Sequence, residues 1–125
     1  MFTPKQRRLL KKFAKFLKNP KLKQTKSALR GDNGAKCCLG HLCEFYRKET
    51  GKGRWRNDNG MWYFFASKDD YDYQTLPNTV REFFGLNGPN PTLLIGDEEE
   101  AAAVWNDQVG LSLAEISKGF AALVK

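Results

Sequence analysis

Three cysteines and one histidine form the densest cluster of potentially reactive groups in the sequence. They lie within seven positions, at Cys37, Cys38, His41 and Cys43. Zinc binds thiolate and imidazole ligands, and Cys37 and His41 are one helical turn apart. A single helix, however, spreads these four positions around its circumference, and the chain has no further Cys or His to complete a tetrahedral site. The pattern therefore favours free cysteines packed in the core, with no metal and no other cofactor.

The same residues also allow a nucleophilic thiol. Cys37 is expected near a helix N-terminus, where the helix dipole lowers a thiol pKa, and His41 would serve as its base. Asn106 or Asp107 would orient the imidazole. These residues predict, as an alternative function, a small-molecule or nucleotide-signal binder or enzyme with a pocket near Cys37, His41, Asn106 and Asp107. The pattern favours a structural role for the Asn-Asp pair, as a helix C-terminus and turn, and no catalytic residue is assigned.

Helix signals are spread along the whole chain. Thr3-Pro4-Lys5-Gln6 and Ser112-Leu113-Ala114-Glu115 are capping boxes, and each begins a helix. Gly51 and Gly85 are typical residues after a helix end. Four consecutive acids at 97–100 are expected at a helix start, where the dipole favours negative charge. The predicted helices cover residues 4–18, 37–49, 80–84, 101–105 and 113 onward.

One β-hairpin is predicted in the middle of the chain. Strong strand formers at Gly53–Arg56 and Met61–Ala66 flank an Asn-Gly turn at residues 57–60. Residues 67–75 are expected to form a polar loop, and residues 92–95 a short strand. The fold class is therefore α+β and mainly helical, with four to five short helices around a small β-hairpin in one domain of 125 residues.

Positive charge is concentrated at the front of the chain. The formal net charge is +7, yet residues 1–30 hold eleven Lys or Arg and no acid, whereas residues 31–125 form a mildly acidic body. In the first predicted helix, Leu9, Leu10, Phe13 and Leu17 form an apolar stripe, and cations occupy the other side. An anionic partner is expected to bind these cations, and solubility is the alternative explanation. The predicted contacts are Arg7, Arg8, Lys11, Lys12, Lys15 and Lys18.

Aromatic and basic residues also alternate in the predicted hairpin. Arg54 and Arg56 stand beside Trp55, and the second strand contains Trp62, Tyr63, Phe64 and Phe65. Such a surface could stack nucleobases and hold phosphates, and both arginines are added to the predicted contacts. Strand alternation directs at least half of these rings into the core. Neither glycine-rich phosphate-loop template is present in the sequence.

Several short motifs resemble a group of small uncharacterised proteins encoded in bacteriophage genomes. The shared features are Cys37-Cys38-Leu39-Gly40-x-Leu42-Cys43, Leu76-Pro77 followed by Val80, Asn90-Pro91, and Asn106-Asp107 before Leu113-Ala114-Glu115-Ile116. The resemblance covers about residues 15–120. It implies a phage-encoded accessory protein of the bacterial cytoplasm and supplies no chemistry. His41 replaces an aliphatic residue of that group, which weakens both the zinc and the Cys-His interpretations.

These observations predict a non-enzymatic accessory protein that binds an anionic partner, either nucleic acid or an acidic host protein, through its basic N-terminal helix. Through that partner it would modulate host machinery or defence. A further alternative is a peripheral membrane binder whose first helix lies on anionic lipid. The longest apolar run, Met61–Ala66, is far shorter than the ~20 residues of a membrane span. The absence of a leader pattern and the three cysteines favour the cytoplasm.

Overall fold

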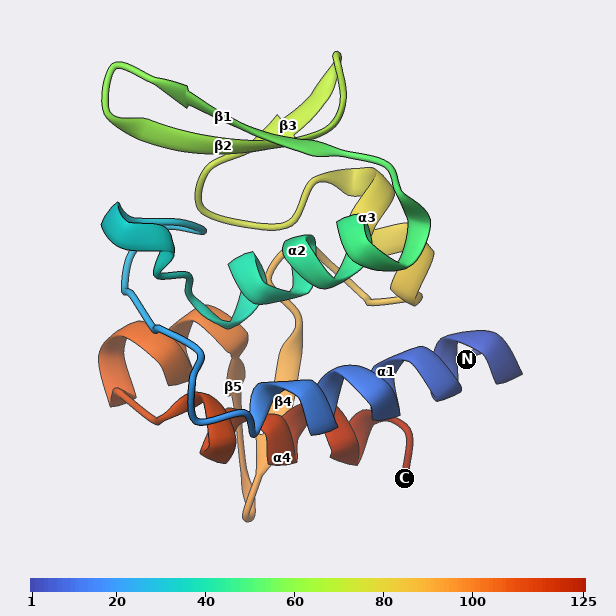
Figure 1. Cartoon of the computed structure of the whole chain (residues 1–125). Helices are drawn as coiled ribbons and strands as arrows, with labels where there is room; N and C mark the ends of the chain where they lie inside the picture. The colour runs from blue at the N-terminus through green and yellow to red at the C-terminus, as the bar shows by residue number, and fades with distance from the viewer.

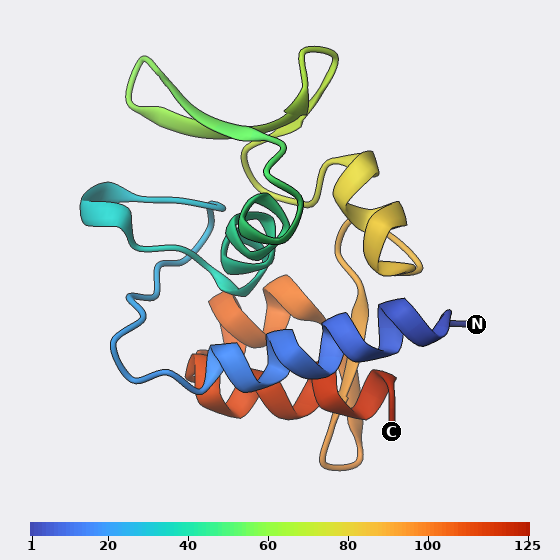
Figure 2. The same cartoon turned by 45° about the vertical axis from the view of Figure 1, so that its right-hand side comes forward.

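The computed structural model describes residues 1–125 as an α+β fold with two small sheets (Figure 1). One sheet arches over the long axis of α2, and α1 and α4 lie side by side on the other side of α2 (Figures 1 and 2). The helices are α1 (Pro4–Leu17), η1 (Asp32–Gly34), α2 (Cys38–Thr50), α3 (Asn78–Phe84), η2 (Val104–Val109) and α4 (Leu113–Leu123). The strands are β1 (Arg54–Asp58), β2 (Met61–Ser67), β3 (Asp70–Asp72), β4 (Thr92–Ile95) and β5 (Glu98–Ala101).

The predicted capping boxes begin α1 and α4. In α1, the Thr3 hydroxyl accepts a hydrogen bond from the Gln6 backbone N–H at 3.1 Å, and the Thr3 N–H donates to the Gln6 side chain at 2.9 Å. Ser112 and Glu115 repeat this arrangement in α4. The apolar stripe of α1 is buried and packs mainly against α4. It comprises Leu9, Leu10, Phe13, Ala14 and Leu17.

The helix α2 is the central element and is buried along its first two turns. Cys37 is its N-cap, and Gly51 ends it in the left-handed conformation with φ of 70°. Gly40 lies against the backbone of the connector, the segment of residues 18–37 between α1 and α2, where a Cβ atom would stand only 1.8 Å from the Leu29 carbonyl oxygen. A side chain at position 40 would therefore separate α2 from the connector. This close approach explains why glycine occupies the last position of the Cys-Cys-Leu-Gly segment.

The predicted hairpin is confirmed, but it belongs to a larger sheet. β1 and β2 pair antiparallel, and β3 adds a third strand through the pairs Phe64–Asp72 and Phe65–Tyr71. The prediction of a loop over residues 67–75 is therefore wrong for β3. A register shift between Phe65 and Ser67 lets this short, polar strand pair with β2.

The acidic segment also differs from its prediction. Thr92–Ile95 is a strand, as expected, but it pairs with Glu98–Ala101, which was predicted to begin a helix. Gly96 and Asp97 form the turn between the two strands, with Gly96 at φ of 68°. β5 is solvent-exposed, so its three glutamates remain hydrated. Two small sheets therefore replace the single predicted hairpin, and helical structure resumes only after Ala101.

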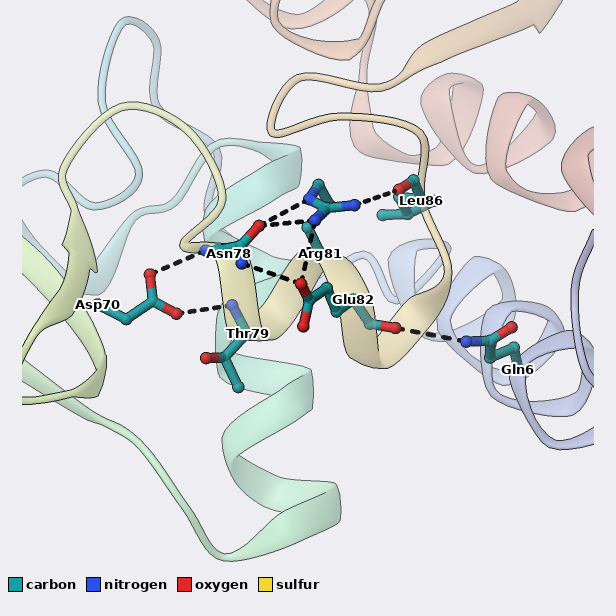
Figure 3. A network of polar contacts seen from close by, with 7 residues as sticks. All are labelled: Gln6, Asp70, Asn78, Thr79, Arg81, Glu82 and Leu86. Carbon is teal, nitrogen blue, oxygen red and sulfur yellow. Dashed lines mark hydrogen bonds and ion pairs between the residues drawn. The ribbon is translucent and has the colours of Figure 1, made fainter.

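The short helix α3 is held by one side chain from α1 and one from β3 (Figure 3). It begins at Asn78, two residues before the predicted start, because the Asp70 carboxylate of β3 accepts hydrogen bonds from the backbone N–H groups of Asn78 and Thr79 at 2.9 and 2.6 Å. Gln6 of α1 donates to the Glu82 carbonyl at 3.4 Å. The network therefore links α1, α3 and the three-stranded sheet.

None of the helices has both the length and the apolar character that crossing a membrane requires.

Candidate functional site

The cysteines of the predicted reactive cluster are buried thiols. Cys37, Cys38 and Cys43 are all free and buried. Burial raises the pKa of Cys37 to about 11, although the Gly40 and Leu39 backbone N–H groups act in the opposite direction. The expectation that the helix dipole would lower this pKa is therefore wrong, because the thiolate would lose its hydration. A protonated thiol at neutral pH is a poor nucleophile and a poor metal ligand.

The imidazole of His41 is likewise buried and neutral. Its Nε2 is hydrogen-bonded to the Lys23 carbonyl oxygen at 2.9 Å, which makes Nε2 the protonated nitrogen. Burial, with a smaller contribution from the charge of Lys36, lowers the pKa of His41 to about 4, although the hydrogen bond with Lys23 acts in the opposite direction. The ring packs edge-on against Phe16, with 6.3 Å between centroids. His41 thus joins the connector to α2 and fills space in the core.

Asn106 is a fully buried residue of the π-helix η2 whose side chain forms hydrogen bonds to other segments. Its side-chain oxygen accepts hydrogen bonds from Cys38 N at 3.1 Å and Gln24 Nε2 at 2.9 Å. Its side-chain nitrogen donates to the Thr25 carbonyl at 2.9 Å and to Asp107 Oδ1 at 2.8 Å. Every polar atom of this side chain is engaged by the chain itself. This geometry fits the structural interpretation of the Asn-Asp pair.

No cavity lies beside the four residues of the predicted pocket. Cys37, His41, Asn106 and Asp107 line none of the surface hollows. No group of three or more Cys, His, Asp or Glu side chains is arranged to hold a metal ion. The predicted small-molecule site therefore has no geometric support at this place.

The outward side of α1 carries the predicted cationic contacts. At 100° per residue, most of the cations between positions 5 and 18 lie on the side away from the buried stripe, and Arg7 lies at the edge of that stripe. The helix contains no acid. Lys12 is paired with Glu49 at 3.0 Å, and Arg7 donates to the Val124 carbonyl at 3.3 Å. The remaining predicted contacts are exposed and have no ion pair or side-chain hydrogen bond within the chain. We call them the free α1 cations: Arg8, Lys11, Lys15 and Lys18.

The apolar side of α1 is fully used within the molecule. Leu10 and Phe13 are completely buried, and Leu17 is 1% exposed. The ring of Phe13 packs edge-on against Phe120 of α4, with 5.0 Å between centroids, and lies tilted against Phe45 of α2, with 5.4 Å between centroids. A helix that lies on a membrane needs these apolar side chains for the lipid. In this fold they belong to the core.

The three-stranded sheet has two different faces. Register places Trp55 opposite Phe64 on the inner face, where the two rings meet edge-on at 4.9 Å and Phe64 is completely buried. The outer face holds the predicted Arg54 and Arg56, which pair in register with Phe65 and Tyr63. Sequence reasoning missed two further residues beside them. They are Lys68 and Tyr71, and the β3 pairing that places Tyr71 there was not recognised.

A basic hollow opens at the edge of the sheet. It has a volume of about 430 Å³ and is lined by Arg30, Lys36, Glu44, Arg47, Gly53, Arg54 and Trp55. The Arg30 guanidinium lies 3.7 Å from the centroid of the Trp62 ring, and its Nε is buried without a hydrogen-bond partner. Burial lowers the pKa of Lys36, and the charge of Arg30 lowers it further.

Glu44 provides the counter-charge in this hollow. Burial alone would raise its pKa, but hydrogen bonds from Arg47 and from the Trp55 indole N–H lower it to about 2. These bonds measure 2.7 Å from Arg47 Nη2 and 2.9 Å from Trp55. Glu44 therefore stays ionised and fixes the edge of the sheet to α2.

A known family model covers most of the chain. Residues 5–121 match the domain of unknown function DUF8296. The chain belongs to this family. The comparisons with curated proteins and with solved structures found no match.

Two positively charged surfaces lie within the DUF8296 domain, and the fold keeps them apart. Figures 1 and 2 both place α2 between α1 and the three-stranded sheet. The free α1 cations and the pair Arg54 and Arg56 were predicted as one set of contacts. They form two surfaces, and each requires its own test.

Proposed function

We propose that this protein is a non-enzymatic accessory protein that binds nucleic acid through the outward side of α1. The supporting observation is that the free α1 cations lie on one exposed side of a helix without acids. The apolar side of the same helix is anchored in the core, so the backbone positions that carry these cations are fixed relative to one another. In line with the resemblance of its motifs, we further propose a phage origin and a role in the host cytoplasm.

The proposed mechanism is electrostatic. Long cationic side chains neutralise phosphates and release the counterions condensed on the nucleic acid, so affinity falls steeply with salt. If each of the four free α1 cations neutralises one phosphate of duplex DNA, log K changes with log salt at a slope of about −3.6. Between 50 and 200 mM salt, affinity would fall about 150-fold. Such binding carries no sequence preference, because phosphate contacts do not read bases.

Fluorescence anisotropy with a labelled 20-base-pair DNA duplex tests the proposal. Lys11→Gln with Lys15→Gln removes two of the free α1 cations and should halve the salt slope, to about −1.8. The matched control is Lys48→Gln with Lys52→Gln, which removes the same charge from two exposed positions, one in the last turn of α2 and one just after its C-cap. This control should keep the wild-type slope.

Two outcomes would overturn the proposal. One is equal salt slopes for the two double variants. The other is a wild-type chain that does not bind the duplex at 50 mM salt but binds poly-glutamate, which would indicate an acidic protein partner instead. Co-sedimentation with anionic vesicles in place of DNA binding would indicate the membrane alternative.

A further inference from the structure

The outer face of the β1-β2-β3 sheet combines the exposed ring of Tyr71 and the partly exposed rings of Tyr63 and Phe65 with cations. Strand register places the outward side chains of β1 opposite those of β2, and Tyr71 of β3 opposite Phe65. We call this surface the sheet platform. It comprises Arg54, Arg56, Tyr63, Phe65, Lys68 and Tyr71.

The rings of the sheet platform remain available to a ligand, unlike those of the inner face. Phe65 and Tyr71 stack on each other, with centroids 4.6 Å apart and planes 23° from parallel. Tyr71 is nevertheless 51% exposed, which leaves one of its faces open to solvent. The Tyr63 ring lies 6.0 Å from the Tyr71 ring between centroids, and their planes are inclined at 68°. The three rings therefore enclose a corner, which we call the aromatic corner. An aromatic corner exposed to water is an unusual use of apolar surface unless a ligand covers it.

A hollow of about 350 Å³ lies within this corner, at the lower end of the volumes of ligand sites. Its lining includes Arg56, Lys68 and the Asp58 carboxylate in addition to the rings. A flat ring would stack on the aromatic side chains, while Asp58 would accept a hydrogen bond from an exocyclic amino group. The volume of the hollow and its lining of rings, cations and one acid fit a nucleobase.

The cations of the sheet platform form no ion pair within the chain, although Asp58 lines the same hollow as Arg56 and Lys68. The guanidinium groups of Arg54 and Arg56 both lie 6.0 Å from the centroid of Phe65, and neither they nor Lys68 form an ion pair. Two nearby acids are turned toward the protein backbone. Asp70 binds the start of α3, and Asp72 accepts the N–H groups of Tyr73 and Gln74 at 2.7 and 2.9 Å. The platform thus presents free positive charge beside its rings.

We infer that the sheet platform binds single-stranded nucleic acid, with unpaired bases stacked on its rings and phosphates paired with its cations. A duplex does not fit this surface, because its bases are already stacked on one another and their faces are inaccessible. An acidic peptide would satisfy the cations but not the aromatic corner. The inference goes beyond the proposed function, since it uses a different surface and does not require α1.

Anisotropy with a labelled dC12 strand and a labelled 12-base-pair duplex separates the two surfaces. Tyr71→Ala removes the most exposed ring and should weaken binding of dC12 about tenfold, with duplex binding unchanged. Tyr71→Trp should retain binding, because an indole also stacks on bases. Leu94→Ala, at a position 44% exposed on β4, is the control for loss of an exposed apolar side chain and should bind as wild type.

The outcomes for the two surfaces are distinguishable. A chain that binds dC12 but not the duplex would refute the proposed role of α1 alone. Equal dC12 affinity for Tyr71→Ala and wild type would refute the sheet platform alone. The sheet platform would also be refuted if the double variant Lys11→Gln with Lys15→Gln lost as much affinity for dC12 as it loses for the duplex. Photo-crosslinking of an oligonucleotide that contains 5-iodouracil should label Tyr63, Phe65 or Tyr71, and labels confined to α1 would overturn the inference.

Discussion

The buried imidazole of His41 makes the stability of this protein depend on pH. Its folded pKa is about 4, whereas the ordinary value is 6.5, because burial disfavours the charged ring. Between these two values the unfolded chain binds a proton that the folded chain does not. The free energy of unfolding should therefore decrease as pH falls from 6.5 toward 4, by about 2–3 kcal/mol in all.

Urea unfolding between pH 7 and pH 5 measures the larger part of this decrease in the free energy of unfolding. In this pH range most carboxylates do not yet titrate. The variant His41→Leu loses the hydrogen bond to Lys23 and should be less stable at pH 7, but its stability should change little down to pH 5. Parallel pH profiles for wild type and variant would show that His41 is not the responsible group.

For single residues, the sequence predicted burial and structural roles better than it predicted pKa values and close packing. The burial of the cysteines followed from their usual behaviour, and a structural role for Asn106 was favoured. The raised pKa of Cys37 could not be predicted, because it is the balance between a helix N-terminus and desolvation by segments distant in sequence. The need for glycine at position 40 depends in the same way on the approach of Leu29.

Among the elements, those with local signals were predicted and those that depend on pairing were missed. The capping boxes of α1 and α4 and the Asn-Gly turn act within a few residues. β3 and β5 are polar and become strands because β2 and β4 offer them partners. For β5 a signal was present: Gly96-Asp97 is a two-residue hairpin turn after a predicted strand. The four acids were instead assigned to a helix start, where their charge would also be favourable.

A side chain outside the helix caps α3, which leads to a prediction about this element. Pro77 occupies the N-cap position and offers no side-chain hydrogen bond, so the Asp70 carboxylate of β3 serves instead (Figure 3). Asp70→Ala would leave two N–H groups unpaired and should reduce the free energy of unfolding by about 1–2 kcal/mol. Chemical denaturation measures the loss.

The neighbouring Asp69 provides the control for this prediction, because it is exposed and forms no hydrogen bond. Asp69→Ala removes the same charge and should change stability by less than about 0.5 kcal/mol. Burial alone would raise the pKa of Asp70, but its hydrogen bonds with Thr79 and Asn78 lower it. The difference between the two variants should therefore shrink as pH falls through this lowered pKa. A difference that persists in strong acid would contradict the capping role.

For the whole molecule, the fold assigns two roles to the first helix. Its apolar side completes the core against α4 and α2, and its polar side carries the free α1 cations. The sequence predicted both sides of this helix from periodicity alone. It did not predict that α2 would lie between these cations and the sheet that carries Arg54 and Arg56, because the placement of α2 depends on the tertiary arrangement (Figure 2).

The double role of α1 means that its deletion tests folding and not partner binding. A chain starting at Gly31 would lose Leu9, Leu10, Phe13 and Leu17, whose burial contributes about 6–12 kcal/mol together. This amount is comparable with the total stability of a small domain, about 5–15 kcal/mol. We expect the shortened chain to show no cooperative thermal transition by circular dichroism, whereas the full chain with Lys11→Gln and Lys15→Gln should keep the wild-type transition. A cooperative transition in the shortened chain would show that residues 31–125 form a core without α1.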